Sequence, residues 1–381
     1  MLSARAATLL DAASWTHHIL GVSEVGLLED RARFIGGGAD APVIRHDDGQ
    51  HEWPAGKFEC HAINSLRQQV LSRGKTKDER YIPITVIDGI DIGHLQATLT
   101  TDQRAMVQIA SNFNALEVPN RDCAPDHGGL VTNYAVDSSQ GPAASFGVPA
   151  ACLLRAHYPF RAEDVDPSEW GQTIHRQIEL LSGVRSQFGT AVNGKVTLRG
   201  DETPIDSDEE MRTVADRIQV GLHSDAQVIF DRGPCDAAGK VQLQLLPLDR
   251  RPLVDQVLAA SVNLNSLGVV PQSAERTRWL VRAALRAAYD GAYLTSIVRE
   301  RRLLVLTLIG GGVFGNQVDD IIEAIAEAHS EWAPHSSLDE VRLCLYQPGT
   351  AALFEAKLLA RLEDLGSDSY EIEPACCCSI A

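Results

Sequence analysis

The hydrophobic positions of this chain fall into short apolar runs separated by longer amphipathic stretches. Helical spacing predicts helices near the N-terminus and at 170–184, 274–301 and 317–329. Runs rich in β-branched and aliphatic residues predict strands at 81–92, 105–110, 225–232, 240–249, 303–309 and 341–347. Because strands that alternate with helices form a sheet covered on both faces, the pattern predicts an α/β fold.

The same pattern divides the chain into three parts. Residues 1–78 form a mixed N-terminal extension that ends in a polar run, residues 79–350 carry the regular alternation, and residues 351–381 predict a helix and a cysteine-rich tail. The formal net charge is −17, from 51 acidic and 34 basic residues. Such a charge repels phosphate backbones, so we expect no nucleic-acid partner.

One apolar run breaks into glycines: "LTLIGGGVFGN", from Leu306 to Asn316. A strand, a glycine-rich turn and a helix together present free backbone N–H groups to an anion. Asn316 suits the N-cap position of the following helix. A tight turn that needs glycine only for its backbone angles is the alternative interpretation.

The glycines also satisfy the spacing of the dinucleotide fingerprint, which would suggest an NAD-dependent oxidoreductase. That fingerprint requires an acidic residue at the end of the next strand, where this chain has Tyr346 and Gln347. A diphosphate held mainly by backbone contacts is therefore the favoured ligand. No lysine followed by serine or threonine comes after the last glycine, which excludes a Walker loop.

A second unusual stretch, residues 110–147, follows the apolar run "MVQIA". Loops at strand ends are where α/β proteins bind their ligands. Its polar residues could equally form a solvated loop. The residues of interest are Asn112, Asn114, Glu117, Asp122, Asp126, His127, Asp137 and Gly141.

Together, "ASNFNALE", "YAVDSSQGPAA" and "LTLIGGGVFGN" resemble a divergent branch of the macrodomain family. They are most similar to its arginine-directed ADP-ribosylhydrolases, over roughly residues 81–349. The resemblance implies a three-layer α/β/α fold with a mixed central sheet, and an enzyme that removes mono-ADP-ribose from a modified protein. A non-catalytic ADP-ribose reader with the same pocket is the alternative.

The resemblance also implies roles for individual residues. It assigns catalysis to Asp137, Asp126 and Glu117, with Asp122 or His127 as substitutes for the last two. A carboxylate near the anomeric carbon can stabilise an oxocarbenium ion or activate water, and a second acid can hold the guanidine leaving group. The implied ADP-ribose-binding residues are Asn112, Asn114, Gly141, Gly310, Gly311, Gly312, Val313, Phe314, Gly315 and Asn316.

We expect no cofactor and no metal ion, because no metal-ligand spacing such as HExxH occurs. The tail ends "CCCSIA", and its last four residues have the form of a prenylation box at Cys378. Cys377 and Cys376 are candidates for palmitoylation, which would supply the second anchor. A frayed tail whose cysteines carry no lipid is the alternative interpretation. The sequence thus predicts a cytoplasmic protein, attached to a membrane face if the tail is lipidated, with an ADP-ribosylated protein as partner.

Overall fold

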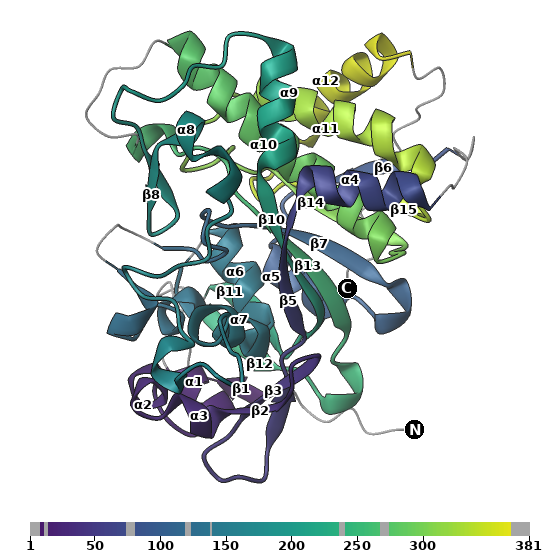
Figure 1. Cartoon of the computed structure of the whole chain (residues 1–381). Coiled ribbons are helices and arrows are strands. Elements are labelled where there is room, and N and C mark those ends of the chain that lie inside the picture. Colours follow the sequence, from purple (N-terminus) through teal and green to yellow (C-terminus); the bar gives the residue numbers. More distant parts are fainter. Residues whose placement is uncertain are drawn as a thin grey trace, which may run out of the picture.

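A seven-stranded mixed sheet forms the centre of the protein (Figure 1). The computed structural model describes residues 8–10, 14–73, 81–118, 123–137, 139–235, 241–266 and 274–366. Asp122 and the three tail cysteines, Cys376, Cys377 and Cys378, lie outside the described residues. The strands of the central sheet, in spatial order, are β5 (Lys57–Ala62), β10 (Gln219–Gln227), β13 (Leu253–Ala259), β7 (Ala105–Ala110), β14 (Leu303–Thr307), β15 (Glu340–Cys344) and β6 (Ile84–Ile87).

Strands β13, β7, β14, β15 and β6 run parallel, whereas β5 and β10 are antiparallel to their neighbours. The N-terminal part of the chain, which we expected to form an extension, therefore contributes β5 to the central sheet. The smaller sheets are β1 (Thr8–Leu10), β12 (Val241–Leu245) and β11 (Phe230–Cys235); β2 (Ile35–Gly38), β3 (Ala41–Arg45) and β4 (Glu52–Pro54); and the hairpin of β8 (Thr190–Val192) and β9 (Lys195–Thr197).

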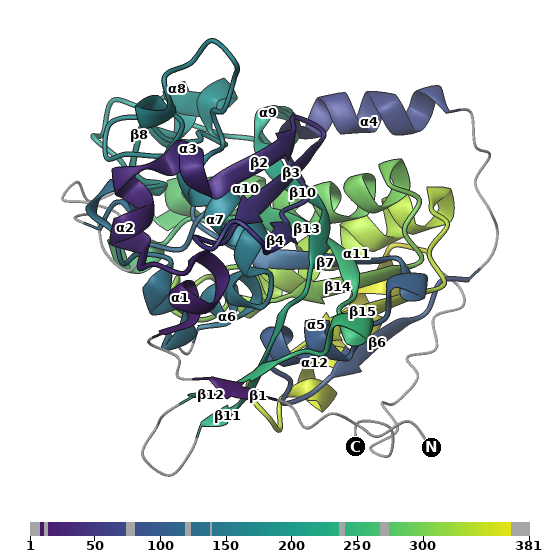
Figure 2. The ribbon, with the colours of Figure 1, turned by 90° about the horizontal axis from the view of Figure 1, so that it is seen from below.

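Helices cover both faces of the central sheet, which confirms the three-layer α/β/α prediction (Figures 1 and 2). Gln108 of β7 donates to the Ala288 carbonyl of α10, and its register partner on β13 is Val257. The preceding residue on β13, Gln256, points to the opposite face, where its amide donates to Gln96 and to the Ala144 carbonyl. Side chains on the two faces of the sheet thus contact two different layers of helices.

Helices α4 (Ile63–Ser72), α9 (Asp208–Arg217) and α11 (Val318–Trp332) pack around α10 (Ala274–Val298), and α12 (Ala351–Asp364) packs on α11. On the Gln256 face lie α5 (Ile92–Thr98), α6 (Gln140–Gly147) and α7 (Pro149–His157). The remaining helices are α1 (Trp15–Leu20), α2 (Glu24–Glu29), α3 (Arg31–Phe34) and α8 (Arg185–Phe188). No described helix combines the length and the apolar character needed to cross a membrane.

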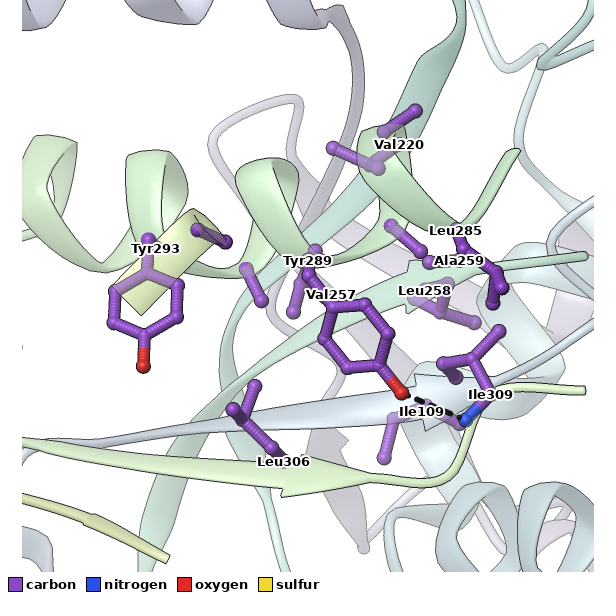
Figure 3. Close-up of a cluster of buried hydrophobic side chains, with 14 of the residues drawn as sticks. Ile109, Val220, Val257, Leu258, Ala259, Leu285, Tyr289, Tyr293, Leu306 and Ile309 are labelled. Carbon is purple, nitrogen blue, oxygen red and sulfur yellow. Dashed lines mark hydrogen bonds between the residues drawn. The ribbon is translucent and has the colours of Figure 1, made fainter. Parts of the chain in front are cut away.

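The core between α10 and the sheet holds two fully buried tyrosines, Tyr289 and Tyr293 (Figure 3). A buried tyrosine normally needs a hydrogen-bond partner for its hydroxyl. Tyr289 Oη donates to the Thr307 carbonyl at 2.8 Å and accepts the N–H of Ile309 at 3.1 Å. The core therefore fixes the end of β14, where the glycine loop begins.

Two predicted helices are wrong. Residues 170–184 form bends and a short 3-10 helix, Ser182–Val184. The buried Gln172 binds the backbone of Asn114, Arg155 and Ile178, and Leu180 donates to the Phe113 carbonyl. These tertiary bonds compete with the backbone bonds of a helix. Near the N-terminus, the described residues Thr8–Leu10 pair with β12 as a strand.

Candidate functional site

Three parallel strands end at one level on one edge of the central sheet. Ala259 at the end of β13 pairs with Ala110 at the end of β7, and Val107 pairs with Val305 of β14. The segments that follow, residues 260–266, 111–118 and 308–316, therefore leave the sheet beside one another. Neighbouring strands lie only about 4.8 Å apart, so the two stretches singled out in the sequence emerge from adjacent positions.

The glycine loop presents unused backbone donors. The N–H groups of Gly310, Gly312, Val313 and Phe314 donate no hydrogen bond to any described residue. Gly312 and Val313 are exposed, and a Cβ atom built on Gly312 would meet nothing within 4 Å. Successive backbone N–H groups without an acceptor in the protein can form a concave site for an anion.

The rest of the loop is held rigidly. Gly310 has a φ of 77°, and a Cβ atom there would lie 2.1 Å from Oδ1 of Asn316. The Asn316 side chain donates to the Val262 carbonyl at 2.8 Å and accepts from the Ser261 hydroxyl. The prediction that Asn316 caps the next helix is wrong, because Gln317 holds the N-cap position. Asn316 instead ties the loop to the end of β13.

Two aspartates lie in the first turn of α11, where they would oppose a bound anion. Asp320 is buried and pairs with Arg278 at 2.9 Å, and Asp319 pairs with Lys357 at 2.5 Å. Each negative charge therefore has a cationic partner. The positive end of the α11 dipole remains available to an anion on the loop.

The loop after β7 is buried and internally bonded. Asn114 accepts the Leu116 N–H at 3.2 Å and donates to Gln177 at 3.3 Å, and Asn112 donates to the Val118 carbonyl. The turn of the β8–β9 hairpin lies against them, since a Cβ atom on Gly194 would lie 2.7 Å from Oδ1 of Asn114. Both asparagines shape the loop through these bonds, and their role in orienting the ribose stays a prediction.

Glu117 lies over the start of α6. A Cβ atom on Gly141 would lie 2.6 Å from Oε1 of Glu117 and 2.3 Å from the Ala110 carbonyl oxygen, so only glycine leaves room for this carboxyl group. Burial, followed by repulsion from Asp137, raises the pKa of Glu117 to about 8, against an opposing effect of Lys195. Glu117 is therefore largely protonated at neutral pH.

Asp137 lies near enough to Glu117 for its charge to raise the pKa of that carboxyl group. One carboxylate oxygen of Asp137 accepts the backbone N–H of Ser139 at 2.8 Å and its hydroxyl at 2.5 Å, just before α6 begins. Asp126, in the 3-10 helix Pro125–His127, has a buried Oδ1 without a described partner, and His127 is exposed. No described interaction joins Asp126 to the other two acids.

Tyr134 holds the backbone of Glu117. Its fully buried hydroxyl accepts the Glu117 N–H at 2.7 Å and donates to the Glu117 carbonyl at 2.7 Å. This use of one hydroxyl for a donor and an acceptor matches that of Tyr289 at the end of β14. Each half of the candidate site is thus anchored by a buried tyrosine from a different element.

Replacing Tyr134 with phenylalanine should lower the free energy of unfolding by about 2 kcal/mol, because both backbone groups of Glu117 lose their partner. Urea denaturation measures this loss. Tyr158→Phe is the control, since the buried Tyr158 hydroxyl has no partner among the described residues and its removal should cost nothing. Equal losses in the two variants would show that the two hydrogen bonds between the Tyr134 hydroxyl and the Glu117 backbone do not stabilise the site.

The N-terminal part of the chain supports the segment that carries Tyr134. Glu24 of α2 accepts the backbone N–H groups of Val131 and Thr132 at 3.2 and 2.8 Å, and lies 3.1 Å from Nε2 of His157. Trp15 Nε1 donates to the Thr132 carbonyl at 3.0 Å. These bonds fix the 3-10 helix Thr132–Ala135, which carries Tyr134.

Some residues of the site were not found by sequence reasoning. Asn265 donates to the Val313 carbonyl at 2.6 Å, and Leu264 donates to the Phe314 carbonyl, so the segment after β13 forms one wall of the glycine loop. The signal was present: "LAASVNLN" after β13 repeats the pattern of "IASNFN" after β7, an apolar run followed by serine and alternating asparagines.

No protein-family model matches the chain, and no curated protein matches it. Solved structures with a similar arrangement include a poly(ADP-ribose) glycohydrolase from Deinococcus radiodurans in complex with ADP-ribose, with 16% identity and a TM-score of 0.46 over 81% of this chain and 95% of that one. Another is the poly(ADP-ribose) glycohydrolase from Thermomonospora curvata, with 15% identity and a TM-score of 0.40 over 89% and 96%. Both are named for poly(ADP-ribose), and neither for ADP-ribosylarginine. Similarity at this level concerns the arrangement of the chain and does not identify a function.

Proposed function

We propose that this protein is an ADP-ribosylhydrolase that removes mono-ADP-ribose from arginine side chains of a modified protein. One observation carries the proposal: the free amides of Gly312, Val313 and Phe314 follow the strand next to the one that leads to Glu117. An anion-binding loop and an acid with a raised pKa thus leave the sheet side by side. ADP-ribose contains both features that such a pair would recognise, a diphosphate and a glycosidic bond.

The ligand chemistry follows from the donors present. Gly312, Val313 and Phe314 offer N–H groups without a cationic side chain among them, which suits a diphosphate held by backbone contacts. The protein as a whole carries a net charge of −17, so the attraction of the anion comes from local groups such as these backbone dipoles and not from the overall charge. The start of α11 lies directly after the loop and adds its positive dipole end.

The two carboxyl groups suit different steps. Glu117, protonated at neutral pH, would donate its proton to the guanidine nitrogen as the bond to the ribose carbon breaks. Asp137 would stabilise the oxocarbenium ion and accept a proton from the attacking water. When their environments give two carboxyl groups different pKa values, one can act as the acid and the other as the base. Asp126 stays a third candidate, for contact with the guanidinium group.

The test is a release assay with three arms: arginine-ADP-ribosylated protein, poly(ADP-ribose), and free ADP-ribose in calorimetry. We expect free ADP-ribose from the first arm and binding in the third. Binding without release would identify a reader module. Shortening of the polymer with an untouched arginine conjugate would show that the enzyme cleaves ribose–ribose bonds instead.

Gly312→Val should weaken ADP-ribose binding at least about tenfold without destabilising the fold. The φ of Gly312 is not positive and its Cβ direction is open, so valine fits the backbone and fills open space at the loop that a bound diphosphate would need. Gly38→Val is the matched control, because Gly38 is also exposed with nothing within 4 Å of its Cβ position. Calorimetry and urea denaturation measure both quantities. Unchanged affinity for ADP-ribose in Gly312→Val would show that the glycine loop does not bind the ligand.

The location of the protein is part of the same proposal. Cys376, Cys377 and Cys378 lie beyond the described residues, and lipid on them would hold the enzyme at the cytoplasmic face of a membrane. Metabolic labelling with a prenyl analogue in eukaryotic cells, compared with a Cys378→Ser variant, tests this anchor directly.

A further inference from the structure

The turn between β3 and β4 brings two histidines and an aspartate together, far along the chain from the residues of the candidate active site. His46 and His51 pair across the turn, where the His46 N–H donates to the His51 carbonyl at 2.9 Å. Between them, Oδ2 of Asp48 lies 2.7 Å from Nδ1 of His51 and 3.2 Å from Nδ1 of His46. Among the described residues, this is the group whose ligand atoms all lie within 4.8 Å of one another.

The turn's own backbone orients these atoms. Oδ1 of Asp48 accepts the N–H groups of Gln50 and His51 at 2.8 and 3.2 Å, which turns Oδ2 toward the two imidazoles. The His46 ring packs against Gly21, where a Cβ atom would lie 2.9 Å from Cε1. The turn is fixed to the end of α1, because Asp47 donates to the Leu20 carbonyl at 2.7 Å.

One imidazole nitrogen of each histidine faces the same carboxylate oxygen. Nδ1 of His46 and Nδ1 of His51 lie 3.2 and 2.7 Å from Oδ2 of Asp48. Three ligand atoms from a single turn thus lie within 4.8 Å of one another.

The separations also suit coordination. A divalent ion held at about 2.0–2.1 Å places neighbouring ligand atoms about 2.9–3.4 Å apart, close to the 2.7 and 3.2 Å found here. Imidazole nitrogen and carboxylate oxygen are ligands for zinc and its neighbours in the first transition row. Asp47 is not part of the set, since its carboxylate pairs with Arg33.

We propose that His46, Asp48 and His51 bind a divalent transition-metal ion, with Zn²⁺ as the natural candidate and water completing its coordination. The ion would close the β3–β4 turn. Because this turn is fastened to α1, and α1 packs on the 3-10 helix that carries Tyr134, a bound ion would stabilise the N-terminal part of the chain. The site is independent of the proposed hydrolase chemistry.

The test uses the full-length protein after removal of metal ions by dialysis against chelator, followed by removal of the chelator. Titration with Co²⁺ followed by its visible absorption, and with Zn²⁺ by calorimetry, should each show one equivalent bound. A rise in the melting temperature with Zn²⁺ should accompany binding. His51→Ala, whose side chain is exposed, should keep the fold and weaken binding at least about tenfold.

His17→Ala is the matched control, an exposed histidine on the neighbouring α1 with no place in the cluster. It should bind Zn²⁺ like the unmodified protein. Equal affinity in His51→Ala and the unmodified protein would overturn the proposal, as would no binding to the metal-free protein or equal weakening in His17→Ala. Circular dichroism of each variant confirms that a loss of binding is not a loss of structure.

Discussion

Replacing Glu117 with glutamine should reduce release of ADP-ribose by about a thousandfold while ADP-ribose still binds. Glutamine has the shape of the protonated acid and fits the space above Gly141, but its amide cannot deliver a proton to the leaving guanidine. The loop of free amides, which would hold the diphosphate, is untouched. Release rates under saturating substrate, together with calorimetry of ADP-ribose, separate the two effects.

The same variant has a signature in the pH dependence of stability. Because burial, and then Asp137, raise the pKa of Glu117 to about 8, the folded protein keeps a proton that the unfolded chain loses above its ordinary pKa of 4.5. Stability should therefore fall as pH rises from about 4.5 to about 8, by about 1.4 kcal/mol for each unit of displacement. Urea denaturation at pH 5 and pH 8 should show this fall in the unmodified protein and not in Glu117→Gln.

Asp137→Asn supplies the companion measurement. Without the neighbouring negative charge, the pKa of Glu117 should move down, so the fall in stability should end at a lower pH.

Two outcomes in Glu117→Gln would contradict these predictions. Release of ADP-ribose at the unmodified rate would show that Glu117 does not act as the acid. An identical pH dependence in that variant and the unmodified protein would show that the carboxyl group is not held protonated.

The sequence predicted the site best where the signal is local. The run from Leu303 to Thr307 is buried on all sides and is followed by glycines, so both the strand and the loop could be recognised within about a dozen residues. Their position beside the 111–118 segment follows from the adjacency of β7 and β14, which a single sequence does not specify. That adjacency is what turns two unusual stretches into one candidate site.

The errors arise from contacts between distant segments. Asn316 was assigned to a helix cap, but its partners Ser261 and Val262 come from another strand end. The 170–184 segment has helical spacing, yet Gln172 and Leu180 bond to the loop after β7 instead. In each case a buried polar group found a tertiary partner, and the periodicity of the sequence carries no information about such partners.

The N-terminal part of the chain illustrates the same point. Its role could not be read from the sequence, because Glu24 acts on Val131 and Thr132, more than a hundred residues away. Composition alone makes Glu24 an ordinary surface acid of an amphipathic segment. The structure makes it a buried acceptor that supports Tyr134 and, through Tyr134, the backbone of Glu117.

Replacing Glu24 with alanine should destabilise the protein by about 3–5 kcal/mol at neutral pH, since removing one partner leaves buried groups without a counterpart. The lost contacts are to the backbone of Val131 and Thr132, the Thr132 hydroxyl at 2.9 Å and His157. Burial by itself would raise the pKa of Glu24, but the bonds from His157 and Thr132 lower it overall. The stabilisation is therefore complete above pH 4.5 and disappears as pH falls through the lower folded pKa.

Urea denaturation at pH 7, with Glu29→Ala as the control, measures this effect. Glu29 ends the same helix but is exposed, so its removal should change the free energy of unfolding by less than about 0.5 kcal/mol. Hydrogen exchange at the Thr132 amide should accelerate in Glu24→Ala alone, because that amide loses its acceptor. If the free energy of unfolding fell no more in Glu24→Ala than in Glu29→Ala, the N-terminal segment would contact the site without stabilising it. The contacts that lead from Glu24 through Tyr134 to Glu117 would then not support the site.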